Sequence, residues 1–97
     1  MFTNFVTGLV KVNVGTLSIP TLATNAGTIN VASGASFTDA NGFINTGTLT
    51  GAGAIIVGTG VSRLVNRGTI NPGGIGLVGT LNITGDVLLD TGSNLQV

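Results

Sequence analysis

One short phrase, Asn-x-Gly-Thr followed by Leu or Ile, recurs along this chain and constrains the fold more than any other feature. Its copies occupy residues 13–17, 25–29, 45–49 and 66–70, and Gly79-Thr80-Leu81 is a truncated fifth copy. A phrase repeated within 97 residues is typical of a repeat architecture, in which each repeat builds the same supersecondary unit. We therefore interpret the chain as a stack of similar units.

The residue types favour β-structure over helix. Glu is absent, Lys occurs once, and Gly, Thr, Asn and Val, which are weak helix formers, dominate the sequence. Alternating runs such as Thr80-Leu81-Asn82-Ile83 have the period of two that a strand with one buried face requires. Gly or Asn interrupts these runs every few residues, as tight turns demand. We predict an all-β chain.

The spacing of the phrase predicts coils. Its Asn recurs at Asn25, Asn45 and Asn66, a period near 20 residues, with half-period echoes elsewhere. Hairpins are the alternative, but only Asn41-Gly42 has the form of a two-residue hairpin turn. We predict one β-solenoid domain over residues 1–97 with about four to five coils, whose strands stack about 4.8 Å apart. Residues 25–97 fit regular coils, and residues 1–24 form a looser first coil.

Each position of the phrase receives a structural role in this interpretation. Asn forms a side-chain ladder that satisfies backbone groups at a corner, Gly makes the corner, Thr lines the outside, and the aliphatic residue stacks inside. The predicted rows are Asn13, Asn25, Asn45 and Asn66 for the ladder; Thr16, Thr28, Thr48, Thr69 and Thr80 outside; and Leu17, Ile29, Leu49, Ile70 and Leu81 inside. Pro72-Gly73 has the order that a type II turn prefers and is expected at a corner.

The ends of the chain and its low charge point to self-association. Phe2 and Phe5 crowd the N-terminus, where both an end cap and a contact with another chain fit, and Leu95 and Val97 lie at an end without a charged or helical cap. Solenoid ends need covering, so either the chain continues or its ends meet other subunits. Only 6% of residues are charged, against about 25% in typical domains, and the net charge is zero. Such a surface favours association.

Catalytic, metal and cofactor sites are not expected. The chain has no Cys and no His. Gly-x-Gly-x-x-Gly at residues 74–79 lacks the following helix that a dinucleotide site needs, and Leu77 stands where a calcium-binding repeat would carry Asp. Asp86 and Asp90 adjoin turn residues, where solvated Asp is common. We predict no catalytic residue, no cofactor and no metal.

Nucleic acid and membrane partners are not expected either. Arg63 and Arg67 form the only basic spot, which is too small to follow a phosphate backbone. The longest apolar stretch, residues 51–61, is shorter than the roughly 20 residues of a membrane-spanning helix.

Residues 66–74, 79–86 and 91–97 together resemble the β-strand repeats of autotransporter passengers and related large secreted bacterial surface proteins. The resemblance covers residues 25–97 well, whereas the register of the first coil stays open. It implies a right-handed parallel β-helix on the outside of a bacterial cell, acting as a stalk, an adhesin or a matrix component. Family members that are enzymes carry catalysis in added domains or loops, and this sequence contains no such insertion.

Three functional classes follow. The first is an extracellular or cell-surface structural module that stacks end to end into a homo-oligomer or filament. The alternative is a binding module, either an adhesin for an unidentified surface or glycan ligand or an ice-binding surface made of stacked Thr rows. The third, a polysaccharide lyase or hydrolase, would need clustered acids or a basic residue in a groove. We predict the first class and no enzymatic activity.

Overall fold

The structure, a computed structural model, describes residues 2–73, 79–90 and 92–95. These residues form fourteen short β-strands and one 3-10 helix, η1. The strands are β1 (Phe2–Asn4), β2 (Leu9–Val12), β3 (Thr16–Ser18), β4 (Leu22–Asn25), β5 (Thr28–Val31), β6 (Ser36–Asp39), β7 (Phe43–Asn45), β8 (Thr48–Gly51), β9 (Ala54–Val57), β10 (Leu64–Asn66), β11 (Thr69–Pro72), β12 (Asn82–Thr84), β13 (Val87–Leu89) and β14 (Asn94–Leu95), and η1 spans Gly60–Ser62.

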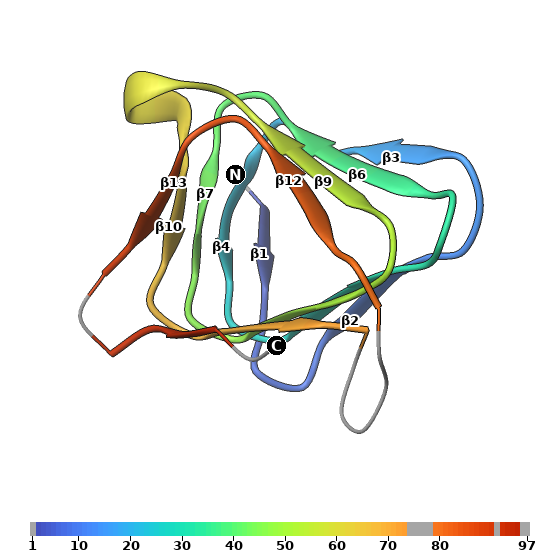
Figure 1. The fold of residues 1–97 in the computed structure, drawn as a ribbon. Helices are drawn as coiled ribbons and strands as arrows, with labels where there is room; N and C mark the ends of the chain where they lie inside the picture. Colours follow the sequence, from blue (N-terminus) through green and yellow to red (C-terminus); the bar gives the residue numbers. More distant parts are fainter. Residues whose placement is uncertain (1, 74–78, 91, 96–97) are drawn as a thin grey trace.

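The strands wind into a three-sided β-solenoid (Figure 1). Sheet A has the order β1-β4-β7-β10-β13, sheet B the order β14-β11-β8-β5-β2, and sheet C the order β12-β9-β6-β3. Each coil contributes one strand to each sheet, so the described chain makes four three-stranded coils and begins a fifth with β13 and β14. The predicted all-β solenoid of four to five coils is therefore confirmed.

The strand pairs are parallel in all three sheets of the described chain, and they join residues about one coil apart. Asn25 pairs with Asn45, and Thr28 with Thr48. Hairpins would make antiparallel pairs, so they are excluded here. Asn41-Gly42 connects strands of two different sheets rather than two strands of one hairpin. In Figure 1 the chain runs down sheet A, along sheet B and back up sheet C while advancing toward the viewer, which makes the coils right-handed.

The core is built from aliphatic columns that run along the stack. In β8, Leu49 is buried while Thr48 and Thr50 on either side are half-buried, which is the alternation expected of a strand with one face inside. Each sheet supplies such a column: Ile29, Leu49 and Ile70 from sheet B, Phe37 and Ile55 from sheet C, and Leu22, Phe43 and Leu64 from sheet A. Phe37 and Phe43 meet edge to face within this core, with their ring centroids 6.0 Å apart.

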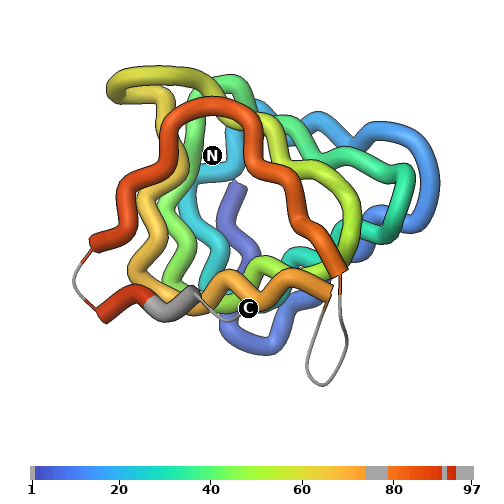
Figure 2. The backbone as a smooth tube through the Cα atoms, in the orientation of Figure 1, coloured from blue at the N-terminus to red at the C-terminus, as the bar shows by residue number. Residues whose placement is uncertain are grey.

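The two ends of the solenoid are different sheet edges. The edge strands β1, β2 and β3 all belong to the first coil, whereas β12, β13 and β14 form the opposite edges. Figure 2 shows the early residues at one end of the stack and the late residues at the other. Because the strands are parallel, the two ends offer complementary edges to each other.

Candidate functional site

A ladder of buried asparagine side chains runs along the corner between sheets A and B. Asn4, Asn25, Asn45 and Asn66 end successive strands of sheet A and are at most 6% exposed. Each Nδ2 donates to the Oδ1 of the next Asn along the stack, at 2.8 Å, 2.8 Å and 2.9 Å. The ladder therefore has a direction, with its donors turned toward the C-terminal coil.

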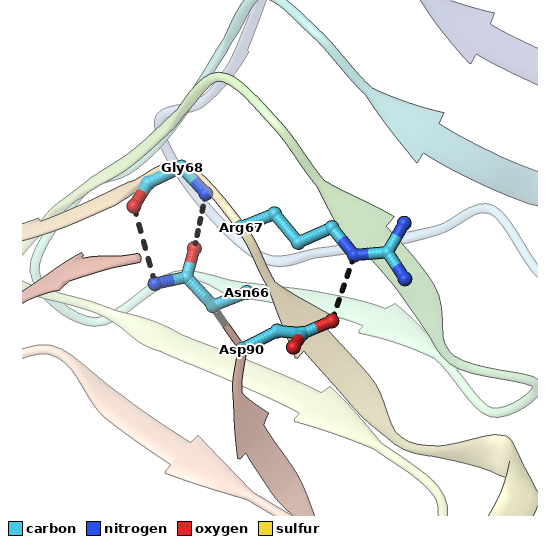
Figure 3. A network of polar contacts seen from close by, with 4 residues as sticks. All are labelled: Asn66, Arg67, Gly68 and Asp90. Carbon is cyan, nitrogen blue, oxygen red and sulfur yellow. Dashed lines mark hydrogen bonds and ion pairs between the residues drawn. The ribbon is translucent and has the colours of Figure 1, made fainter. Parts of the chain in front are cut away.

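The same side chains hold the corner backbone. Nδ2 of Asn45 also donates to the carbonyl oxygens of Gly47 and Thr69, both at 3.3 Å. The backbone carbonyl of Asn45 in turn accepts from the Arg67 N–H at 2.8 Å. Figure 3 shows the last rung, where Asn66 Oδ1 accepts from Gly68 N at 3.3 Å and Nδ2 donates to Gly68 O at 3.4 Å. A buried polar group without a hydrogen-bond partner destabilises the folded state. At this corner the Asn carboxamides provide hydrogen-bond partners for the buried backbone groups.

The glycine of the phrase is required because consecutive corners lie very close together. A Cβ added at Gly47 would overlap the carbonyl oxygen of Gly27, and one at Gly68 would overlap the carbonyl oxygen of Gly47. The following Thr N–H uses these carbonyls, since Thr69 N donates to Gly47 O at 2.8 Å. Asn and Gly thus act together. The Asn side chain supplies hydrogen bonds inside the corner, and the Gly lets the backbones of consecutive coils approach each other closely.

The ladder prediction was wrong for Asn13. Asn13 is exposed between β2 and β3, and Asn4 occupies the first rung instead. The phrase at residues 13–17 lies at a different corner, because the 12 residues from Asn13 to Asn25 cover two sides of the triangle, β3 and β4, and not a whole coil. Asn4 escaped detection because three residues lie between it and Gly8, whereas the phrase has a single residue between Asn and Gly. Its spacing of 21 residues from Asn25 was the available signal.

The predicted Thr and aliphatic rows each split between two sheets. Thr28, Thr48 and Thr69 pair side by side in sheet B, as do Ile29, Leu49 and Ile70. Thr16 and Leu17 instead lie in sheet C, where they pair with Ser36 and Phe37. Thr80 and Leu81 precede β12 and belong to no strand; Thr80 is exposed, and Leu81 packs partly buried against the core. Single rows of five are therefore corrected to rows of three.

The residues marked for self-association lie at or beside the open edges as far as the structure describes them. Phe2 is in edge strand β1 and 39% exposed, and Phe5 follows this strand with 74% exposed. Leu95 belongs to edge strand β14. Val97 lies outside the described residues, as does most of the glycine-rich stretch at residues 74–79.

The exposed carboxylates are separated and bind different groups. Asp86 and Asp90 flank the two ends of β13. Asp86 Oδ2 accepts from Gly60 N at 2.8 Å, while Asp90 Oδ2 accepts from Arg67 Nε at 2.9 Å (Figure 3). The two carboxyl groups therefore do not form a pair. Within residues 2–73, 79–90 and 92–95, no three potential metal-ligating side chains of the His, Cys, Asp and Glu types cluster together.

One buried carboxyl group was missed by the sequence analysis. Asp39 ends β6 with its side chain in the interior and no exposed surface. Its Oδ1 accepts from the Asn41 N–H at 3.2 Å, while Oδ2 has no hydrogen-bond donor among the described residues. Burial raises the pKa of Asp39 to about 6, against a smaller lowering by the Asn41 N–H. The alternation Ser36-Phe37-Thr38-Asp39 was the sequence signal, because it places Asp39 on the same face as Phe37.

Two further findings bear on what the chain is. In the described part of the chain, no helix has the length and apolar character needed to cross a membrane. Comparison of the chain with family models, with curated proteins and with solved structures gave no match.

Proposed function

We propose that this protein is a structural β-solenoid module that stacks end to end with copies of itself. One observation carries the proposal: each of the three sheets ends, in the described chain, in an unpaired edge strand at both ends of the stack. An edge strand presents a row of free N–H and C=O groups and readily pairs with another strand. Three edges on one end face make a larger template than any single edge.

The direction of the strands favours head-to-tail stacking. In this arrangement β13, β14 and β12 of one copy meet β1, β2 and β3 of the next, and each sheet continues as a parallel sheet. The inner column of sheet A also continues, because Val87 and Phe2 are each 39% exposed at the two ends. Burial of such apolar surface contributes about 25 cal/mol per Å². A head-to-tail contact repeats without closing and so builds a filament.

Charge supports the same proposal. Three basic and three acidic residues in 97 leave little repulsion between copies. We further propose that the module works outside a bacterial cell, as part of a surface fibre, stalk or matrix. The support for this location is the resemblance of residues 25–97 to the repeats of secreted bacterial surface proteins.

A proline substitution in each edge strand of the first coil tests the proposal. Phe2 N, Val12 O and Ile19 N bond into the stack, so the neighbouring residues Thr3, Lys11 and Ser18 direct their own N–H groups to the free edge. The triple variant Thr3→Pro, Lys11→Pro, Ser18→Pro removes these donors, and the matched triple alanine variant keeps them.

Electron microscopy over a concentration series gives the readout of this test. The unchanged chain and the alanine variant are expected to form filaments, and the proline variant to stay short. A stable monomer of the unchanged chain in sedimentation, at every concentration, would overturn the proposal.

A binding surface on sheet B is the second candidate function. The outward row Thr28, Thr48 and Thr69 supports it, because regular hydroxyl rows can order water or a ligand. The adjacent row is less regular, and Thr50 Oγ1 already donates to Asn71 O of the next coil at 2.8 Å. Thermal hysteresis and glycan binding, measured with Thr48→Tyr and Thr69→Tyr, distinguish this function from stacking. Loss of either activity with filaments unchanged would favour the binding surface.

A further inference from the structure

The outer face of sheet A carries an open hollow of about 270 Å³ with a mixed apolar and polar lining. Ala23, Ile44 and Val65 contribute to its lining from three successive strands, and Val61 and Arg63 contribute from the connection between β9 and β10. Ile44 and Val65 each stand between two buried residues of their strand, which places both side chains on the outer face. Support for an interaction at this place therefore comes from the apolar side chain that projects next to the hollow and from the charges around it.

A fully exposed apolar side chain projects beside this hollow. Val61 is 99% exposed at the middle of η1. The turn that carries it is fixed, because Ser62 N donates to Thr59 O at 3.0 Å and Gly60 N donates to Asp86 Oδ2 at 2.8 Å. Figure 1 shows this connection extending outward from the corner above β10. The fold therefore keeps Val61 exposed to water on a projecting turn, although a shorter connection between β9 and β10 would lack this turn.

The charges around the two features are complementary. Arg63 lines the hollow and is exposed, and it has no acidic partner among the described residues. The exposed carboxylate of Asp86 lies at the base of the projecting turn, through its bond to Gly60 N. The face therefore carries one positive and one negative side chain next to the projecting turn.

We propose that this face docks against the same face of a second copy, with Val61 of each chain inserted into the hollow of the other. The projection and the hollow occupy one face, so a two-fold arrangement uses each of them twice and is self-complementary. Arg63 then faces the partner's Asp86 on both sides of the axis. The contact is lateral, so it is independent of the end-to-end stacking proposed above. In a filament it repeats along the length, and avidity strengthens a weak single contact into side-by-side bundling.

Disulfide trapping tests the geometry directly, since the chain has no Cys of its own. A Val61→Cys protein is mixed with an Ile44→Cys protein of different mass, and the mixture is oxidised. Each partner is also mixed with a Val14→Cys control, whose valine is 86% exposed in the connection between β2 and β3. The 61–44 mixed disulfide is expected to form several-fold faster than either control pairing, and equal rates would overturn the proposal.

The trapping is carried out both in the unchanged chain and in the triple proline variant. The edge substitutions change no residue that lines the hollow, so the mixed disulfide is expected in both backgrounds. Failure of trapping therefore tells against the lateral contact alone, while failure of filament formation tells against stacking alone.

Sedimentation equilibrium of the proline variant gives the energetic test. A monomer–dimer equilibrium is expected, and Val61→Ser should raise its dissociation constant about 100-fold, since two valines leave apolar contacts per dimer. Val14→Ser should leave the constant unchanged. Arg63→Glu should weaken the dimer, whereas Arg63→Lys should largely preserve it. A monomer throughout, or equal effects of the two serine variants, would contradict the docking.

Discussion

Replacing the buried Asp39 with Asn should change the pH dependence of stability. Below its pKa the Asp39 carboxyl is neutral in the folded protein, and above it the interior must hold a carboxylate that is stabilised by a single 3.2 Å bond from Asn41 N. Because burial raises the pKa from 3.8 to about 6, the folded state binds this proton more tightly than the unfolded chain does. The stabilising contribution is therefore present at pH 3.8 and below, and it is lost as pH rises through 6.

The size of the effect follows from the same shift. One pKa unit corresponds to about 1.36 kcal/mol, so the rise from 3.8 to about 6 removes about 3 kcal/mol of stability between acid and neutral pH. The Asp39→Asn side chain stays neutral throughout and escapes this loss. The buried amide of the variant adds its own cost for unpaired hydrogens, about 1–3 kcal/mol, but this cost does not depend on pH. Part of this loss has already occurred at pH 4, so the difference in unfolding free energy should move by about 2 kcal/mol in favour of the variant between pH 4 and pH 7.5.

Urea unfolding of both proteins at four pH values between 4 and 7.5 measures this difference. All other titrating groups are shared and cancel in the comparison. Asp86→Asn serves as the control, because Asp86 is exposed and its substitution removes no buried charge. A difference between Asp39→Asn and the unchanged chain that stays constant with pH would refute the reasoning.

Three further predictions concern the ladder and its corner, and each is measured by urea unfolding. Asn45→Ala should destabilise the fold by about 2–4 kcal/mol because it removes one hydrogen bond from each of the two neighbouring rungs and also the side-chain donor of the Gly47 and Thr69 carbonyls, while Asn13→Ala should cost less than about 0.5 kcal/mol; equal costs would show that the ladder does not stabilise the corner. Gly47→Ala should cost more than Gly34→Ala, because the first forces a methyl group into a neighbouring carbonyl whereas the second, at φ 81°, meets open space and only the left-handed strain of about 1–2 kcal/mol. Leu89→Asn should add a rung and stabilise the fold by about 0.5–1.5 kcal/mol, because Leu89 pairs with the last Asn of the ladder; a destabilised variant would show that the ladder cannot be extended.

The coil architecture could be predicted because its determinants are local and periodic. Asn25, Asn45 and Asn66 recur once per coil, and each brings the Gly that its corner needs. For the copies that begin at Asn25, Asn45 and Asn66, the sequence pattern and the register of sheets A and B agree. The period of the phrase is the period of the solenoid.

The errors in the predicted rows arose because the spacing between two copies of the phrase does not show whether they lie a full coil apart or only part of a coil apart. The copy at residues 13–17 has the right residue types but lies two sides of the triangle before the copy at residues 25–29, so Thr16 and Leu17 join sheet C. Asn4 forms the first rung of the ladder. Its corner has two more residues between Asn and Gly than the phrase has, so the phrase does not match there. Residue types define a corner, but only the summed length of the preceding segments decides which corner it is.

The buried charge and the outer hollow were out of reach for a different reason. Alternation places Asp39 inside, but nothing in the sequence shows that its Oδ2 finds no donor there. The hollow next to Val61 combines residues from three separate segments of the chain, whose proximity depends on the stacking of the coils. Such properties of the assembled fold are absent from any short sequence pattern.

Fibre diffraction from an aligned, concentrated sample tests the central claim most directly. Head-to-tail stacking places every strand across the filament, so a reflection at about 4.8 Å is expected along the fibre axis, with no strong equatorial reflection at the roughly 10 Å spacing of face-packed sheets. The triple proline variant should lose the oriented pattern while keeping its β-structure. A 4.8 Å reflection perpendicular to the fibre axis, or filaments that persist unchanged in the proline variant, would contradict the account.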